Sequence, residues 1–442
     1  MKPAVSTTEM PCGESNQLLD VRCQNQKITK TGVAAAVAGN AIEFYDFVVY
    51  AFFAVYIGRA FFPADSDTGS LLASVAVFGV GFFTRPLGGV LIGAFADRVG
   101  RKAAMILTVA LMTIGTLGIA VTPSYSSIGI AAPVIVVFCR LLQGLALGGE
   151  VGPASALLIE AAPPEQRGLY ASWQIASQGL AAIAAGAFGV FLSATLSAED
   201  LASWGWRIPF IVSLLLIPIA IYIRRQLPET LVSESDRSTG DVVRALFRTH
   251  GKFVALGVLA MLVASITTQV GNYMTTYAIN TLHLPDTLAQ ISTVIGGVVL
   301  FISALIGGVL CDRYGRKSVM IWPRVVTLVL IVPLFYWLTK NPSPVVLYSV
   351  TAIIIALNGM TTAATLVAIP EFFPPALRST GTSITYAVGA TVFGGTTQFI
   401  ITWLISVTND ASAPGYYVMG ACVLSLAAIF LLPETRHKDI SV

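Results

Sequence analysis

The sequence predicts an all-α membrane protein with twelve transmembrane helices in two pseudo-symmetric halves of six. Three observations lead to this fold class. Of the 442 residues, 55% are hydrophobic and only 11% are charged, less than half the charged share of a typical soluble domain. Apolar runs long enough to cross a hydrocarbon layer of about 30 Å recur along nearly the whole chain. Short motifs of the first half return in the same order in the second half.

Hydropathy and turn residues together place the helices and divide the chain into five parts. The helices are expected near residues 32–58, 70–95, 102–122, 131–161, 168–196, 206–224, 252–280, 286–311, 318–338, 345–373, 378–407 and 414–432. The five parts are an N-terminal tail at 1–30, a six-helix bundle at 31–224, a central loop at 225–251, a second six-helix bundle at 252–433 and a C-terminal tail at 434–442. The first tail lacks the apolar stretch of a cleavable signal peptide.

The distribution of basic residues predicts the orientation in the membrane. The loops on one side hold only Arg59, Arg207 and Lys340, whereas the other side, with both tails and the central loop, holds most of the remaining Lys and Arg. Basic loops stay in the cytoplasm, so both termini are expected there. The net charge of +3 gives no support for nucleic-acid binding. The five cysteines lack metal-ligand spacing, and no metal or organic cofactor is expected.

The internal repeat consists of three ordered pairs of motifs. The pattern GxxxDRxGRK occurs at 93–102 and again at 308–317. Two further pairs follow the same order, namely Glu160, Pro163 and Arg167 with Glu371, Pro374 and Arg378, and LPET at 227–230 with LPET at 432–435. A parallel duplication of six helices is typical of transporters that rock two halves about a site between them.

The two loop motifs are interpreted as parts of a gate. Asp97 and Asp312 end helices and are placed to meet the positive N-terminus of a helix in the opposite half, while nearby arginines can pair with Glu160 or Glu371. Such contacts would close the cytoplasmic face in one state and break in the other. A loop that is merely basic needs neither Asp nor fixed spacing. The expected gate residues are Asp97, Arg98, Arg101, Glu160, Arg167, Asp312, Arg313, Arg316, Glu371 and Arg378.

Three carboxylates of the first half are the candidates for proton coupling. Glu43 and Asp46 lie three residues apart on one face of the first helix, and two carboxylates this close in a low dielectric favour the binding of a proton. The alternative is that they pair with a membrane arginine and never titrate. Glu150 is either a further proton site or the counter-ion of Arg85. No histidine falls within the expected helices, which leaves carboxylates to carry protons.

Two deep arginines of the first half, Arg85 and Arg140, predict an anionic substrate. A guanidinium binds a carboxylate through two parallel hydrogen bonds and stays charged, unless nearby carboxylates already neutralise it. Polar faces of the first, fourth, fifth, seventh and tenth helices are expected to complete the path. The expected substrate contacts are Arg85, Arg140, Gln143, Tyr170, Gln174, Gln178, Asn272, Tyr273, Tyr277 and Asn358. Arg324 is expected to extend to the headgroups, with substrate contact as the alternative.

The paired GxxxDRxGRK loops resemble the loop motif of the major facilitator superfamily. Within that family, GNAIEFYDF at 39–47, TRPLGG at 84–89, RLLQGLALGGE at 140–150 and WGWRIPF at 204–210 resemble the metabolite:proton symporters. The resemblance spans nearly the whole chain and implies the major facilitator fold, the bacterial inner membrane and symport with protons. The segment at 393–419 is most similar to bacterial citrate and tricarballylate symporters.

The expected function is therefore import of a small di- or tricarboxylate together with protons, by a monomer in the lipid bilayer. A zwitterionic solute such as proline or betaine, or another organic acid such as α-ketoglutarate or shikimate, remains an alternative. The sequence has no HExxH, no GxSxG and no nucleotide-binding loop, so no enzyme is expected. A channel would not need a gate motif in each half.

Overall fold

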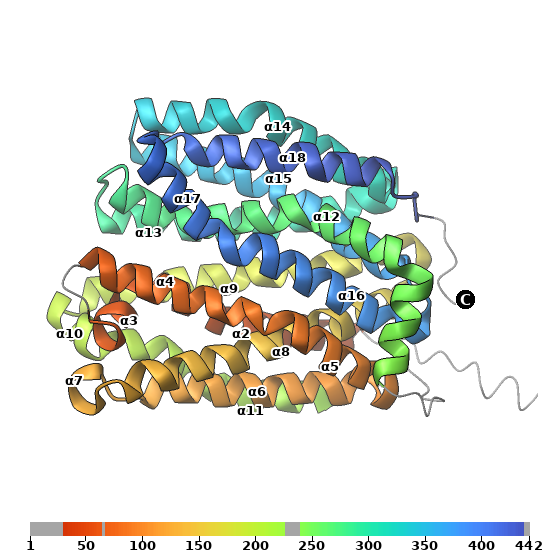
Figure 1. The fold of residues 1–442 in the computed structure, drawn as a ribbon, viewed down its shortest axis with the longest axis horizontal. Coiled ribbons are helices and arrows are strands. Elements are labelled where there is room, and N and C mark those ends of the chain that lie inside the picture. Colours follow the sequence, from red (N-terminus) through yellow and green to blue (C-terminus); the bar gives the residue numbers. More distant parts are fainter. Residues whose placement is uncertain (1–29, 64–66, 226–238, 437–442) are drawn as a thin grey trace, which may run out of the picture.

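The computed structural model describes residues 30–63, 67–225 and 239–436. Within these ranges the chain is almost entirely helical and contains no β-strand. Figure 1 shows long helices side by side in two layers, the N-terminal half in red to yellow-green and the C-terminal half in green to blue. The all-α architecture of two halves that the sequence predicts is confirmed.

The helices of each half follow one another along the chain. The N-terminal half contains α2 (Lys30–Phe52), α3 (Ala54–Phe61), α4 (Asp67–Phe83), α5 (Arg85–Val99), α6 (Arg101–Val121), α7 (Tyr125–Ile128), α8 (Ala131–Ala161), α9 (Arg167–Thr195), α10 (Ala198–Ser203) and α11 (Ile208–Arg225). The C-terminal half contains α12 (Thr239–Asn280), α13 (Asp286–Tyr314), α14 (Arg316–Lys340), α15 (Pro344–Glu371), α16 (Pro375–Gly389), the π-helical η3 (Ala390–Gly394), α17 (Gly395–Thr408) and α18 (Ala413–Phe430).

The described ranges contain twelve long helical segments, as a fold of twelve crossings requires. Ten segments are long and apolar enough to span a membrane, one of them formed across the α4–α5 junction and another by α16 to α17. The crossings formed by α2, with 23 residues, and α11, with 18, complete the set. Helices suit this setting because lipid offers no hydrogen-bond partners and each helix satisfies its own backbone.

The long helix α12 differs from the sequence prediction. It begins at Thr239, so the prediction of a loop through residue 251 is wrong for 239–251, while 226–238 lie outside the described residues. Val242 and Leu246, one helical turn apart, are buried against an apolar cluster that includes Phe373. Burial of this stripe stabilises the helix despite its polar residues. In Figure 1 the first turns of α12 run across one end of the bundle.

That end of the bundle carries residues 93–102 and 308–317, and we call it the motif end. The chain turns sharply there from α5 into α6 and from α13 into α14 at Gly100 and Gly315, whose φ angles are +128° and +96°. Side chains other than glycine rarely adopt such angles. The backbone conformation at these two turns therefore requires the glycine of each DRxGRK motif.

Helices α9 and α13 bring the two halves into direct backbone contact. A Cβ atom added at Gly168 would lie 2.4 Å from the carbonyl oxygen of Gly308, and one added at Gly179 would lie 2.6 Å from that of Gly297. These distances leave no room for any side chain. The glycines thus set how closely the halves approach one another.

Candidate functional site

The first motif joins the halves through Asp97 at the end of α5. Its carboxylate accepts hydrogen bonds from the backbone N–H and the hydroxyl of Thr380 in α16, at 2.8 and 2.5 Å. Arg101 forms an ion pair with Asp97 and also donates to the carbonyl oxygen of Pro375 at 3.2 Å. Asp97 and Arg101 of the N-terminal half therefore both bind the start of α16 in the C-terminal half.

Glu160 adds a second link across the same contact. Its carboxylate lies 2.9 Å from the guanidinium of Arg378 in α16 and 3.4 Å from that of Arg101. Arg167, seven residues after Glu160 and the first residue of α9, is buried, whereas the Arg98 side chain is exposed. A carboxylate shared between arginines of opposite halves holds those halves together.

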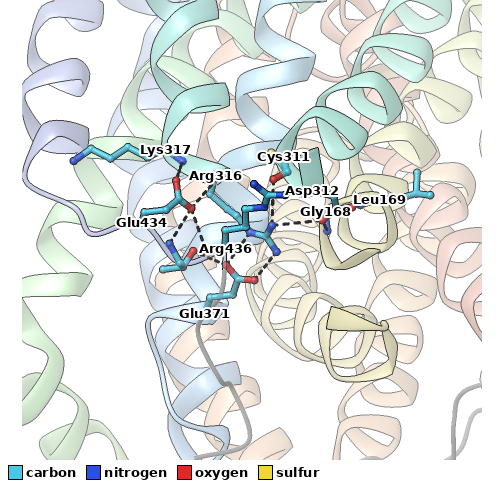
Figure 2. Close-up of polar contacts among 10 residues, drawn as sticks. Gly168, Leu169, Cys311, Asp312, Arg316, Lys317, Glu371, Glu434 and Arg436 are labelled. Carbon is cyan, nitrogen blue, oxygen red and sulfur yellow. Dashed lines mark hydrogen bonds and ion pairs between the residues drawn. The ribbon is translucent and has the colours of Figure 1, made fainter. Parts of the chain in front are cut away.

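The second motif makes the reciprocal contact. Asp312, near the end of α13, accepts hydrogen bonds from the backbone N–H groups of Gly168 and Leu169, at 2.7 and 2.9 Å. These groups belong to the first turn of α9, where backbone N–H groups have no partner within the helix. Figure 2 shows the carboxylate directed at this helix start. Each half thus supplies an aspartate to a helix of the other.

Arg316 connects the second motif to α15 and not to the opposite half. It donates two parallel hydrogen bonds to Glu371, at 2.9 and 3.1 Å, and a longer one to Asp312 at 3.5 Å (Figure 2). Arg313 is exposed and lies over the ring of Tyr314 at 5.5 Å. Of the two arginines, only Arg316 is bound into the contact region.

Glu434 of the second LPET motif caps the start of α14. Its carboxylate accepts from the backbone N–H groups of Arg316 and Lys317, both at 2.9 Å, and from those of Thr435 and Arg436 (Figure 2). Burial raises the pKa of the Glu434 carboxyl, but these four donors outweigh burial and hold the pKa below its usual value. The carboxylate form is thus the one that caps the helix.

A cavity of about 90 Å³ lies between the two halves. Its wall is contributed by α2, α4, α5 and α9 of the N-terminal half and by α12, α13, α15, α16 and η3 of the C-terminal half. The polar side chains in this wall are Arg85, Gln178, Ser265, Thr268, Gln269, Asn272, Thr362 and Tyr386, and the aromatic ones besides Tyr386 are Phe44, Phe47 and Phe82. No carboxylate is among the residues that line it.

Arg85 is the charged residue of this wall. It begins α5, and its guanidinium lies 3.8 Å from the ring centre of Phe82 and 4.7 Å from that of Phe47. The side chain is buried, and its Nε and Nη2 atoms have no hydrogen-bond partner. Among the ion pairs of the described residues, none involves Arg85. A buried cation with unused donors favours an anionic ligand.

Arg140 lies behind the cavity wall and belongs to a chain of hydrogen bonds. Its Nη1 donates to Gln143 at 2.7 Å, Gln143 donates to Thr116 at 2.9 Å, and Thr116 donates to Asp46 at 2.6 Å. The guanidinium also lies over the ring of Tyr50 at 3.9 Å. Arg140 and Asp46 are thus connected through two neutral side chains, and all four groups are buried.

The carboxylates of α2 face away from the central cavity. Glu43 and Asp46 line a second, much smaller cavity against α6 and α11, whereas Phe44 and Phe47 of the same helix face the central one. Glu150 is buried in α8 and does not line either cavity. The polar face of the first helix is therefore directed into the N-terminal bundle.

The predicted substrate residues fall into two groups. Arg85, Gln178 and Asn272 line the central cavity. The others do not line it. Four of them form hydrogen bonds with other segments: Asn358 with Thr267 and Thr268, Gln174 with Ser155, Tyr273 with Thr402, and Tyr277 with the carbonyl oxygen of Ala411. Arg140 and Gln143 belong to the hydrogen-bond chain that ends at Asp46, and Tyr170 lies near the start of α9.

Arg324 does not reach the headgroups, and that prediction is wrong. Its side chain is 0% exposed, and Nη2 donates to the carbonyl oxygen of Ala260 at 2.8 Å and to the hydroxyl of Thr365 at 3.1 Å. The guanidinium therefore points into the C-terminal bundle, where the oxygens of Ala260 and Thr365 accept its hydrogen bonds. Residues 379–386, with Tyr386 at the cavity, were not singled out from the sequence, although their hydroxyl groups recur at helical spacing.

Comparisons with known proteins agree with this architecture. The family profile of the Major Facilitator Superfamily matches residues 36–397 and 280–441. The chain is similar to the citrate-proton symporters of Salmonella typhi (38% identity, 89% of this chain, 92% of the relative) and Klebsiella pneumoniae (36% identity, 88% and 89%). Its fold is similar to that of the proton:xylose symporter XylE, with a TM-score of 0.75, 17% identity and coverage of 93% and 97%. The chain belongs to the major facilitator superfamily and is a multi-pass membrane transporter.

Proposed function

We propose that this chain is a proton-coupled symporter that imports a small di- or tricarboxylate, such as citrate or tricarballylate, by alternating access. Arg85 carries the proposal, because it is a buried guanidinium in the wall between the halves with two nitrogens that lack an acceptor. A carboxylate offers two acceptors in the matching geometry. The similarity to two citrate-proton symporters along nearly the whole chain supports the same substrate class.

Neutral polar groups of α12 would hold the remainder of the substrate. Ser265, Thr268, Gln269 and Asn272 all line the cavity and follow the spacing of one helical face. Their hydroxyl and amide groups can donate to further carboxylates or to a substrate hydroxyl. The site would thus take its charge from the N-terminal half and its neutral donors from the C-terminal half.

Asp46 is the proposed site of proton binding. Protonation would weaken its hold on the Thr116 hydroxyl and so disturb the hydrogen bonds that continue to Gln143 and Arg140. The ring of Phe47 lies 5.3 Å from the Arg140 guanidinium and 4.7 Å from that of Arg85. This contact offers a route from the proton site to the substrate. Glu43 and Glu150 remain further candidates.

In this proposal the motif end faces the cytoplasm and both termini lie there. The basic residues of the loops at this end support that orientation. The contacts of Asp97 and Asp312 with the opposite half would then close the cytoplasmic side and break when the halves, 31–224 and 252–433, rock apart. A monomer would suffice, because a single chain surrounds the cavity.

Uptake into proteoliposomes tests the proposal. The wild-type protein should accumulate labelled citrate or tricarballylate when a proton gradient is imposed, and Arg85→Ala should abolish uptake while Arg85→Lys retains part of it. Arg248→Ala, at an exposed position of α12, serves as the control for loss of an arginine. Uptake by Arg85→Ala at the wild-type rate would rule out the proposed anion site.

A zwitterionic solute is the second candidate, and the aromatic rings of the cavity are the observation in its favour. Such rings can bind a quaternary or secondary ammonium group. Phe47 and Phe82 already lie against Arg85, which leaves Phe44 and Tyr386 for this purpose. Uptake of labelled betaine and of labelled citrate, each with the other as unlabelled competitor, distinguishes the two, since only a zwitterion site would take up betaine.

A further inference from the structure

Arg324 is a buried cation of the C-terminal half. It lies in α14, eight residues or about 12 Å along the helix from Arg316, and its side chain is 0% exposed. One nitrogen, Nη2, donates to the carbonyl oxygen of Ala260 in α12 and to the hydroxyl of Thr365 in α15. The guanidinium is therefore fixed at the meeting point of three helices.

The charge of Arg324 is not neutralised in this structure. Both of its contacts are with neutral oxygens, and Nε and Nη1 have no hydrogen-bond partner. Among residues 30–63, 67–225 and 239–436 no carboxylate forms an ion pair with it. A guanidinium stays protonated at neutral pH, and burying a charge without a partner of opposite charge destabilises the protein. A negative charge that approaches during transport would offset this cost.

A negatively charged substrate in the central cavity would lie near Arg324. Met261, the residue after Ala260, lines that cavity, and so does Thr362, one helical turn before Thr365. The two groups that bind Arg324 are thus one residue and one helical turn away from residues that line the cavity. Arg324, Ala260, Met261 and Thr365 are all buried, so solvent screens the field of this charge weakly.

The internal repeat matches Arg324 with a position that lies beside two carboxylates. Arg324 is the eighth residue after Arg316, and Val109 is the eighth after Arg101, the matching arginine of the first motif. Val109 lines the small cavity that contains Glu43 and Asp46. The region around Val109 in the N-terminal half therefore holds carboxylates, whereas the matching position of the C-terminal half holds a guanidinium.

We propose that Arg324 selects the substrate by its charge, acting through the cavity wall to favour acids with several carboxylates over those with one. This inference rests on the proposed transport of carboxylates. Arg85 would bind one carboxylate directly, and the field of Arg324 would stabilise every further negative charge in the cavity. Two unit charges about 10 Å apart at an effective dielectric constant of about 20 interact strongly enough to change affinity roughly tenfold.

Binding of a charge series to the purified full-length protein tests the proposal. The dissociation constants of tricarballylate, glutarate and butyrate, with three, two and one carboxylates, would be measured by titration calorimetry. Arg324→Gln and Arg324→Met should weaken tricarballylate most, glutarate less and butyrate least, by roughly tenfold for each added charge. Arg324→Lys should restore the wild-type order, and Lys340→Gln, at the exposed end of the same helix, should leave it unchanged.

The outcomes separate this proposal from the proposed function. An equal loss for all three acids, or no loss, in the two neutral variants would show that Arg324 only packs the bundle, with carboxylate transport left intact. Binding of none of the acids by the wild-type protein would overturn both proposals. Thermal unfolding of each variant checks that it is folded, and having two neutral variants keeps the test possible if one of them does not fold.

Discussion

Asp97 accepts hydrogen bonds from both the backbone N–H and the side-chain hydroxyl of Thr380, which lies in the other half of the molecule. Asp312 makes the reciprocal contact with Gly168 and Leu169. Hydrogen bonds to a charged group contribute roughly 1.5–3 kcal/mol each. At the motif end the two halves are therefore held together by a few contacts of known position, and each can be removed separately.

Replacing Asp312 by asparagine should open the motif end. An amide carries no charge and cannot accept as strongly from both N–H groups, so we expect the population of the closed state to fall roughly tenfold or more. Distances between spin labels at exposed positions 99 and 314 would report the change. Asp200→Asn, in α10, is the control. An unchanged distance distribution in Asp312→Asn would show that Asp312 does not hold the halves together.

A methyl group at position 308 should keep the halves from closing. The Cβ atom of Gly308→Ala would lie 2.4 Å from the Ser172 hydroxyl and 2.6 Å from the carbonyl oxygen of Gly168. We expect folded protein with little or no uptake. Gly420→Ala, where a Cβ would meet nothing within 4 Å, should transport normally. Normal uptake by both variants would contradict the tight contact between α9 and α13.

Neutralising Asp46 should separate transport from the proton gradient. Asp46→Asn keeps a hydrogen-bond acceptor for Thr116 but cannot exchange a proton, so we expect counterflow of labelled substrate to persist while accumulation driven by a pH gradient is lost. Thr113→Val, beside the small cavity, provides a neighbouring control. Accumulation by Asp46→Asn at the wild-type level would show that Asp46 is not the proton site and would leave Glu43 and Glu150 as the candidates.

Loss of the Glu434 carboxylate should destabilise the start of α14. Glu434→Gln should lower the free energy of unfolding by about 1 kcal/mol, as for other helix caps, with Glu165→Gln as an exposed control. The pKa of Glu434 is lower in the folded than in the unfolded protein, so its contribution is complete at neutral pH and disappears as the pH falls through the folded-state pKa. Unfolding temperatures of wild type and variant should differ equally at pH 6 and 8 and converge in acid.

The fold and the contacts at the motif end could be predicted because they depend on local patterns. Hydrophobic length determines the crossings, and the repeated DRxGRK places an aspartate and an arginine at equivalent turns. The sequence predicted that Asp97 and Asp312 would meet helices of the opposite half, and both contacts are present. The motif arginines Arg101 and Arg316 also pair with Glu160 and Glu371, respectively.

The orientation of side chains around each helix could not be predicted. In a membrane a polar residue faces protein, but the sequence does not say which neighbouring helix it meets. Glu43 and Asp46 face α6 and α11. The part of α2 that lines the central cavity consists of Phe44 and Phe47, which from the sequence could equally well face lipid. Arg324 has the length to reach the surface, yet Ala260 and Thr365 bind it inside.

The reciprocal contacts at the motif end also bear on how such a protein evolves. Asp97 and Asp312 occupy separate copies of one ancestral unit, and each binds a helix from the other copy. Selection for a closed motif end therefore acts on the two contacts together. A mutation that weakens the contact of one aspartate leaves the contact of the other in place. Duplication in this way lets the interiors of the two halves diverge, with buried carboxylates in one half and a buried arginine in the other, without loss of the contact that joins them.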